Sequence, residues 1–390
     1  MTIEGELTVR LAWDGRQVRR VAIGSSRPFA IARVLSGRTP AEVGALVPRL
    51  FSICGGAQGA AAATALDAAS AHSPDPRRVA GRELVGLLEA AQEHFWRLLI
   101  DWPKAMGHAA ATAPVAAARR EIAPALTRLV AHLPIGRDDG AIEPQTTADL
   151  ARALGPLADE VYGMPPAAWL ALSEPTALAA WTDRGATLPA ILLRELFAEA
   201  PELGLSDVAL MPAATREALL ASIVPAMLGD RSFARAPVWD GVPVETGALA
   251  RQHAHPLVAA LRARDGNVVT TRMVARLTDL AALLERLRNG AMPPGAPPVV
   301  RGHALGKGEG LAVVETARGL LLHRVRLAGG NVADYDIVAP TEWNFHPAGA
   351  LARGLGPLTA DDEPALVRKV RIAVQALDPC VACHIEVGHA

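Results

Sequence analysis

Two of the three cysteines lie close to the end of the sequence, at Cys380 and Cys383, and the third is Cys54. Sulfur ligands at positions i and i+3 can converge on one metal ion, and Pro379 bends the backbone just before the pair. A zinc site would also need a second cysteine pair or histidines, for which His384 is a candidate. Spacing alone supports metal or redox chemistry and a pair of buried thiols equally. A thioredoxin-like motif fits less well, because it would open a helix after a strand.

Composition limits the possible partners and location of the protein. The chain has 390 residues, 51% of them hydrophobic, and a formal net charge of −1. A chain of this size can bury a large core, and its near-neutral charge argues against nucleic acid or an anionic membrane as the main partner. No stretch approaches the roughly 20 apolar residues of a membrane-spanning helix, and a secretory signal pattern is missing. Three cysteines in such a chain are typical of a reducing compartment. We therefore expect a cytoplasmic protein with no nucleic-acid or membrane partner.

The elements that position Cys54 are predicted from the N-terminal part of the chain. Alternating apolar residues over 7–11 and 18–23 predict a β-hairpin. Helices are predicted over 41–51 and 57–71. Cys54 would then lie at a helix–helix junction, where backbone N–H groups could stabilise a thiolate.

The elements that lead to the C-terminal cysteines are predicted in the same way. Apolar residues at helical spacing predict a helix over 83–100, ended by Pro103. Acidic residues and a proline in the first turn predict a last helix, over 361–377, that delivers the cysteine pair. Further predicted elements are a helix over 116–133, a helix over 272–287 and strands over 311–314, 320–327 and 332–338.

Motifs along the chain resemble those of the large subunit of nickel–iron hydrogenases. Glu315-Thr316-Ala317-Arg318-Gly319 resembles the family's E-A-P-R-G strand. Tyr335 with Pro340-Thr341-Glu342-Trp343-Asn344 resembles its Y-x-x-x-x-P-T-x-W-N segment, and Asp378-Pro379-Cys380-Val381-Ala382-Cys383 resembles its terminal D-P-C-x-x-C motif. Five further motifs of the family have counterparts here. Ile3-Glu4-Gly5 resembles R-I-E-G-H, Gly37-Arg38-Thr39-Pro40 resembles G-R-x-P, and Ser52-Ile53-Cys54-Gly55 resembles R-I-C-G-x-C. His94-Phe95-Trp96 resembles H-F-Y, and residues 245–251 resemble G-P-L-A-R. The resemblance covers nearly the whole chain, with a shortened middle.

The resemblance implies an α+β fold, mainly α-helical, with small N-terminal and C-terminal β elements and with the first and last motifs meeting in the centre. It implies a single large-subunit-like domain over 1–390. Within it we distinguish an N-terminal region over 1–105, a divergent helical middle over 106–243 and a C-terminal region over 244–390.

The departures from the family pattern bear on function. In the catalytic family four cysteines hold nickel, and the second of each pair also bridges to an iron that carries CO and cyanide ligands. Cys54, Cys380 and Cys383 match three of these positions, but Ala57 stands at the fourth, and Ala32 replaces the proton-relaying glutamate. A nickel ion with three soft ligands and no proton relay is not expected to turn over hydrogen. We therefore expect no catalytic residues, no enzymatic activity and no nickel.

These losses resemble accessory relatives of the large subunit, the HupK-type hydrogenase expression/formation proteins. The resemblance implies a scaffold or carrier that transiently holds an iron fragment with CO and cyanide ligands before its transfer. The implied partners are a small iron-carrier chaperone, the cyanide/CO assembly complex and the hydrogenase large subunit. Two alternatives stay open: a hydrogen-processing or hydrogen-sensing enzyme with an altered centre, and a metal-free interaction protein.

The expected metal ligands are Cys380 and Cys383, with Cys54 as a third thiolate and His384 as a weaker candidate. Arg318 and Thr341 match family positions beside the iron's diatomic ligands. A guanidinium and a hydroxyl can both donate to a cyanide nitrogen. The alternative for Arg318 is an ordinary ion pair with Glu315.

The family also holds a second, structural divalent ion, through a glutamate matched by Glu4 and a terminal histidine. Glu386 stands at the position of that histidine. The resemblance therefore does not carry over a second divalent ion.

Overall fold

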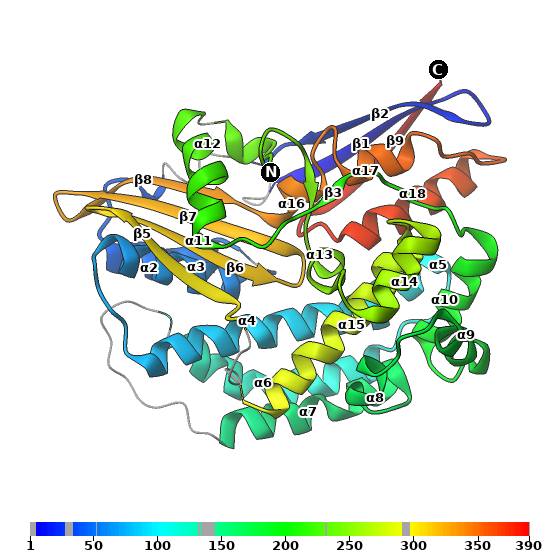
Figure 1. The fold of residues 1–390 in the computed structure, drawn as a ribbon, viewed down its shortest axis with the longest axis horizontal. Helices are drawn as coiled ribbons and strands as arrows, with labels where there is room; N and C mark the ends of the chain where they lie inside the picture. The colour runs from blue at the N-terminus through cyan, green and yellow to red at the C-terminus, as the bar shows by residue number, and fades with distance from the viewer. Residues whose placement is uncertain are drawn as a thin grey trace.

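The chain forms a mainly helical α+β structure in which a four-stranded sheet and a separate three-stranded sheet pack among helices (Figure 1). The computed structural model describes residues 5–27, 34–51, 53–131, 133, 145–230, 232–290 and 297–389. The predicted fold class is confirmed.

The helices described are α2 Pro40–Leu50, α3 Gly55–Ala69, α4 Pro76–Trp96, α5 Trp102–Met106, α6 Thr112–Ala131, α7 Gln145–Tyr162, α8 Pro166–Leu170, α9 Pro175–Arg184, α10 Leu188–Glu199, α11 Arg216–Ala218, α12 Val224–Gly229, α13 Ala248–Gln252, α14 Pro256–Asp265, α15 Val269–Arg288, α16 Pro340–Asn344, α17 Ala350–Leu355 and α18 Glu363–Leu377. Shorter helical turns are η1 Arg97–Asp101, η2 Leu219–Ile223 and η3 Phe233–Arg235. The strands are β1 Glu6–Trp13, β2 Val18–Ser25, β3 Ala209–Leu210, β4 Val244–Glu245, β5 Val300–Gly306, β6 Glu309–Thr316, β7 Gly319–Ala328, β8 Asn331–Val338 and β9 Ala382–His389.

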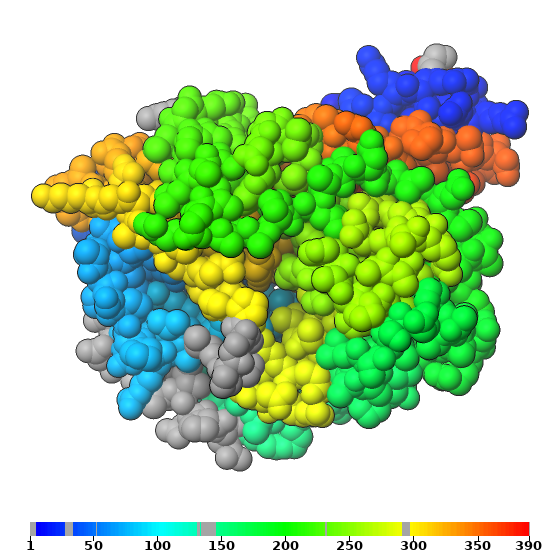
Figure 2. All heavy atoms as spheres, viewed as in Figure 1, coloured from blue at the N-terminus to red at the C-terminus, as the bar shows by residue number. Residues whose placement is uncertain are grey.

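The N-terminal hairpin and the last strand form one sheet. The predicted hairpin is confirmed as the antiparallel pair β1 and β2, and β9 pairs with β1 in parallel from Glu6↔Ala382 to Trp13↔His389. β9 was not predicted from the sequence, because an edge strand of eight residues gains its hydrogen bonds from a segment far away in sequence. This pairing joins the two ends of the chain, since β1, β2 and β9 lie side by side in Figure 1, and it places Cys383 opposite Leu7. In the space-filling view the N-terminal hairpin forms the blue ridge at the upper right (Figure 2).

The four-stranded sheet has the order β5-β6-β7-β8 and is antiparallel. The three strands predicted over 311–338 are confirmed as β6, β7 and β8, whereas β5 was not predicted. Consecutive residues are buried over 310–314 of β6 and 319–325 of β7, because both faces of the sheet are covered there.

Different helices cover the two faces of this sheet. On one face the Ala-rich helix α3 packs so closely that a side chain at Gly310 would lie 2.1 Å from the Ala65 carbonyl oxygen. On the other face Leu219 and Ile223 of η2 belong to one buried cluster with Leu311 of β6. The small side chains of α3 therefore let its backbone approach the sheet.

The helix predicted over 83–100 continues past Pro103, so the predicted end is wrong. α4 passes through a π-helical turn, η1, into α5, where Pro103 occupies the first turn. Pro103 has no N–H, so it cannot donate to the carbonyl oxygen of Leu99, four residues earlier. The Ala111 N–H donates to that oxygen instead, at 2.9 Å. The lost helical hydrogen bond is therefore replaced by a bond from the next segment.

The other long predicted helices are found with shifted ends. α6, α15 and α18 correspond to the helices predicted over 116–133, 272–287 and 361–377, and Asp362 caps α18 by accepting the Ala365 N–H at 2.7 Å. Among the residues that the structure describes, none of the helices combines the length and the apolar character of a membrane-spanning segment.

Candidate functional site

The terminal cysteine pair lies between the end of α18 and β9. Asp378 adopts a left-handed conformation, with φ 57°, directly after α18 and turns the chain toward β9. Cys380 is buried and Cys383 is partly buried. Both cysteines line an open cavity of about 530 Å³, which Ile53 and Arg97 also line. A small molecule or a partner's side chain can therefore reach the pair from outside.

The sulfur of Cys380 lies between a hydroxyl group and a guanidinium group. Thr341 Oγ1, on α16, is 3.1 Å from Cys380 Sγ and also accepts the Cys380 N–H at 3.3 Å. Arg27 donates to the same sulfur from Nη2 at 2.6 Å, and its Nη1 is 3.4 Å from Glu342 Oε2. These donors suit a sulfur that carries negative charge.

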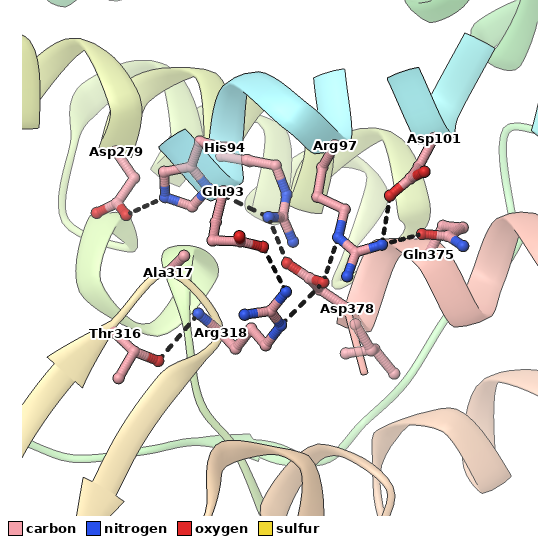
Figure 3. A network of polar contacts seen from close by, with 12 residues as sticks. Glu93, His94, Arg97, Asp101, Asp279, Thr316, Ala317, Arg318, Gln375 and Asp378 are labelled. Atoms are coloured by element: carbon pink, nitrogen blue, oxygen red, sulfur yellow. Dashed lines mark hydrogen bonds and ion pairs between the residues drawn. The ribbon is translucent and has the colours of Figure 1, made fainter. Parts of the chain in front are cut away.

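Arg318 lies on the turn between β6 and β7 and is buried among acidic side chains (Figure 3). Its Nη2 is 2.5 Å from Glu93 Oε2, and its Nε is 3.3 Å from Asp378 Oδ1. The alternative that pairs Arg318 with Glu315 is wrong, because Glu315 pairs with Arg251 at 3.2 Å. The guanidinium of Arg318 is held in the centre of the molecule by these carboxylates.

Asp378 joins three arginines at the start of the terminal motif (Figure 3). Besides Arg318, its carboxylate is 2.6 Å from Arg97 Nε and 2.8 Å from Arg276 Nη1. Burial would raise the pKa of Asp378, but the guanidinium groups of Arg318, Arg97 and Arg276 lower it well below the ordinary range. An ionised buried carboxylate therefore fixes the residue two positions before Cys380.

A buried histidine extends this network into the core. Arg276 Nη1 is 3.1 Å from His94 Nδ1, and His94 Nε2 is 2.8 Å from Asp279 Oδ2. Because arginine can only donate, Nδ1 accepts and Nε2–H donates to Asp279. Burial lowers the pKa of His94 to about 4, so the ring is neutral near pH 7.

Cys54 is the residue just before α3, at the predicted junction between two helices. Gln58 Nε2 donates to its sulfur at 3.7 Å, and Gln58 Oε1 is 2.8 Å from His323 Nε2. Burial, followed by the neighbouring Cys380, raises the pKa of Cys54 well above its ordinary value. Cys54 is therefore a protonated thiol near pH 7.

The expectation that backbone N–H groups stabilise a Cys54 thiolate is wrong. The N–H groups of Gly56 and Ala57 instead donate to the carboxylate of Glu89, on α4, at 2.8 and 3.2 Å. Burial raises the pKa of Glu89 to about 7. A carboxyl group, rather than the sulfur, therefore occupies the N-terminus of α3.

Sites for a metal ion can be tested against the positions of the donors. In the part of the chain that the structure describes, no group of three His, Cys, Asp or Glu side chains is placed to share a metal ion. A preformed three-thiolate site is therefore not found there, and Cys54 as a third ligand stays a prediction. His384 lies next to Cys383 on β9, so their side chains point to opposite faces of the strand. His384 lines the same cavity, its side chain is 58% exposed and its Nε2 is 3.3 Å from Glu6 Oε2, and its role as a weaker ligand stays a prediction.

Glu386, at the position of the histidine that holds the second ion in the family, lies on β9. Glu386 forms an exposed ion pair with Arg10 at 2.7 Å. Glu4 and Ala32 lie outside the described residues.

Three residues of the site were missed by the sequence analysis: Arg27, Glu93 and Asp378. Asp378 is the first residue of the D-P-C-x-x-C motif. Glu93 lies four residues after Glu89 and four before Arg97, a spacing that places all three side chains on one face of a helix. Both signals were available in the sequence. Arg27 carries no such signal, because its contact with Cys380 spans 353 positions.

The fold is that of the large subunit of nickel–iron hydrogenases, as predicted. The Ni-Fe-Se hydrogenase from D. vulgaris Hildenborough superposes with a TM-score of 0.60 at 16% identity, covering 95% of this chain and 94% of that chain. A family model described as nickel-dependent hydrogenase matches residues 258–386. At this level of identity, the structural likeness shows the fold alone.

Relatives that are similar over their full length identify the family within this fold. The hydrogenase expression/formation protein HoxV of Cupriavidus necator is 34% identical, covering 99% of this chain and 97% of its own length. The hydrogenase expression/formation protein HupK of Azotobacter vinelandii is 32% identical, covering 99% of each chain. The chain belongs to the family of hydrogenase expression/formation proteins, as the motifs indicated.

Proposed function

We propose that the protein is a non-catalytic maturation factor for nickel–iron hydrogenase, which holds an iron fragment with CO and cyanide ligands on Cys380 and Cys383. The name of its full-length relatives supports a role in hydrogenase formation. One observation carries the specific role. The sulfur of Cys380 lies within reach of the Thr341 hydroxyl and the Arg27 guanidinium, beside an open cavity that Cys383 shares.

Two thiolates suffice for this cargo. A low-spin iron(II) that already carries strong-field ligands needs only one or two protein donors. On binding, two Fe–S bonds form, the two thiols release their protons to water, and the oxidation state of iron is unchanged. The Thr341 hydroxyl and the buried guanidinium of Arg318 supply hydrogen-bond donors for cyanide nitrogens.

A carrier must also release its cargo, and the site has fewer thiolates than the catalytic family. The fourth cysteine position is Ala57, a buried residue that cannot bridge a metal. A site with fewer thiolates holds iron less tightly, which favours transfer to a site with more. On release the Fe–S bonds break, the acceptor's thiolates replace Cys380 and Cys383, and these two regain protons.

The proposed partners are a small iron-carrier chaperone, the cyanide/CO assembly complex and the hydrogenase large subunit. The open cavity beside the cysteine pair supports this proposal, because donor and acceptor must each bring a ligand to the same iron. A site that lacks the fourth thiolate favours a carrier over an enzyme.

Infrared spectroscopy tests the proposal directly. The protein is co-expressed with the cyanide/CO assembly machinery and purified without oxygen, and its infrared spectrum and metal content are recorded. We expect CO and cyanide bands with iron and no nickel. Cys380→Ser and Cys383→Ser are expected to lose the bands and to impair maturation of the client hydrogenase.

Cys54→Ser tests the predicted third ligand, because it removes the thiol outside the C-terminal pair. We expect the bands to persist in this variant, because two thiolates suffice for the cargo, and their loss would instead identify Cys54 as the third ligand. Absence of bands in the unaltered protein would overturn the carrier proposal. Normal hydrogenase maturation with Cys380→Ser and Cys383→Ser would overturn it as well, and nickel in the purified protein would favour the enzyme alternative.

A further inference from the structure

Arg27 approaches the candidate site from the opposite end of the chain. It follows β2 and reaches Cys380 Sγ from Nη2 at 2.6 Å, with its side chain only 12% exposed. No motif of the sequence analysis includes it.

The hairpin fixes the backbone of Arg27. Gly5 has φ +71°, and a side chain there would lie 2.5 Å from the Arg27 Cα, so only glycine allows this close approach. Next to it, the Ser26 N–H donates to the Glu6 carbonyl at 2.9 Å, and the Glu6 N–H donates to Ser26 Oγ at 2.9 Å. The start of β1, the strand that pairs with β9, therefore holds the backbone of Arg27 in place beside the cysteine pair.

The contacts of Arg27 differ from those of Arg318 and Arg97. Arg318 and Arg97 each lie against ionised Asp378 and a second carboxylate. Arg27 instead contacts both a sulfur and a carboxyl group: its Nη2 is 2.6 Å from Cys380 Sγ, and its Nη1 is 3.4 Å from Glu342 Oε2. Arg27 therefore places a guanidinium directly on the sulfur of the cysteine pair, whereas Arg318 and Arg97 lie on carboxylates.

Cargo binding adds negative charge at this place. Each thiol of the pair that becomes an iron-bound thiolate adds one negative charge, and every cyanide is itself an anion. Burying such charge is costly unless a cation with hydrogen-bond donors lies beside it. A coordinated sulfur keeps lone pairs that can accept a hydrogen bond from a guanidinium.

We propose that Arg27 is a cargo-binding residue of this protein: its guanidinium balances the charge of the iron-bound Cys380 thiolate and donates a hydrogen bond to that sulfur. This inference rests on the proposed function. It adds a second guanidinium, on the hairpin side of Cys380, to the one that Arg318 supplies from the sheet.

The inference is tested with Arg27→Gln and Arg27→Lys in the co-expression and infrared experiment. Because a charge-assisted hydrogen bond is lost, Arg27→Gln is expected to lose the CO band at least about tenfold faster than the unaltered protein during anaerobic gel filtration. Its remaining CO band is expected at lower wavenumber, because a sulfur without a donor pushes more electron density through iron onto CO. Arg27→Lys keeps the charge and is expected to retain more of the band than Arg27→Gln.

Arg82→Gln is the matched control, and a melting curve is recorded for every variant. Arg82 is also buried and pairs with Asp67 at 2.6 Å, beside a different cavity. We expect it to keep the CO band at full intensity and in its place.

The outcomes separate this inference from the proposed function. Bands of unaltered intensity and position in Arg27→Gln would refute the role of Arg27 alone. Equal losses in Arg27→Gln and Arg82→Gln would refute it too, since general destabilisation would then explain both. A greater loss in Arg27→Lys than in Arg27→Gln would contradict the role of charge. If the unaltered protein shows no bands, the proposed function fails and the role of Arg27 fails with it.

Discussion

Replacing Asp378 with asparagine removes one negative charge from the centre of the buried network while keeping the size of the side chain. Three guanidinium groups share this carboxylate. Arg97 would keep Asp101 and Arg318 would keep Glu93. Among the described contacts, Arg276 would keep only the neutral ring of His94. Burial already lowers the pKa of Arg276 below its ordinary value, so it is the residue most affected.

The expected loss of stability follows from the burial of the pair. Removing one partner of a buried ion pair costs about 3–5 kcal/mol, because the remaining charge is left uncompensated. The unfolding entropy is about 2.1 cal/mol/K per residue. For 390 residues it amounts to roughly 0.8 kcal/mol/K, so Asp378→Asn should lower Tm by about 4–6 °C.

Urea denaturation and calorimetry of the unaltered and variant proteins measure this effect. The matched control is Asp207→Asn, which breaks the exposed ion pair with Arg353, where the two side chains are 75% and 52% exposed. This control is expected to change the free energy of unfolding by less than about 1 kcal/mol. If Asp378→Asn stays within the range of the control, then Asp378 does not neutralise the three arginines as described.

Three further predictions concern pH, cargo and backbone geometry. Burial lowers the pKa of His323 from 6.5 to about 3, so its neutral ring stabilises the fold fully above pH 6.5 and less as the pH falls. Between pH 7 and 4, protonation linked to His323 should lower the free energy of unfolding by about 3 kcal/mol. Urea titrations at several pH values should therefore show that this free energy falls less with decreasing pH in His323→Gln than in the unaltered protein, and an equal fall in both would contradict the prediction. Thr341→Val should reduce the infrared CO band more than Thr341→Ser, which keeps a hydroxyl for Cys380, and equal bands would remove Thr341 from the site. Gly319 has φ +129°, and a Cβ added there would lie 2.3 Å from Thr246 Cγ2. Gly319→Ala should therefore lower the free energy of unfolding, measured by urea denaturation, by about 2–5 kcal/mol. Gly330→Ala, with open space around it, should cost about 1–2 kcal/mol, and a smaller loss at Gly319 than at Gly330 would refute the steric explanation.

Elements with a local signal were predicted well. α18 was placed within two residues at its start, because its apolar spacing and its acidic first turn lie within the segment itself. β6 to β8 were found for the same reason. β9 and the continuation of α4 past Pro103 were missed, since β1 supplies the hydrogen bonds of β9 and the Ala111 N–H takes the carbonyl that Pro103 leaves free.

The sequence by itself determined the family and the fold class, and it supplied the candidate ligands, because the types and order of Cys380, Cys383, Arg318 and Thr341 can be read without coordinates. Only the tertiary structure decided the surroundings of these groups. In the folded chain Arg27 donates to the sulfur of Cys380, and the Gly56 N–H at the start of α3 donates to the carboxyl group of Glu89 rather than to Cys54. Contacts between segments hundreds of residues apart follow from packing, which leaves no periodic pattern in the sequence.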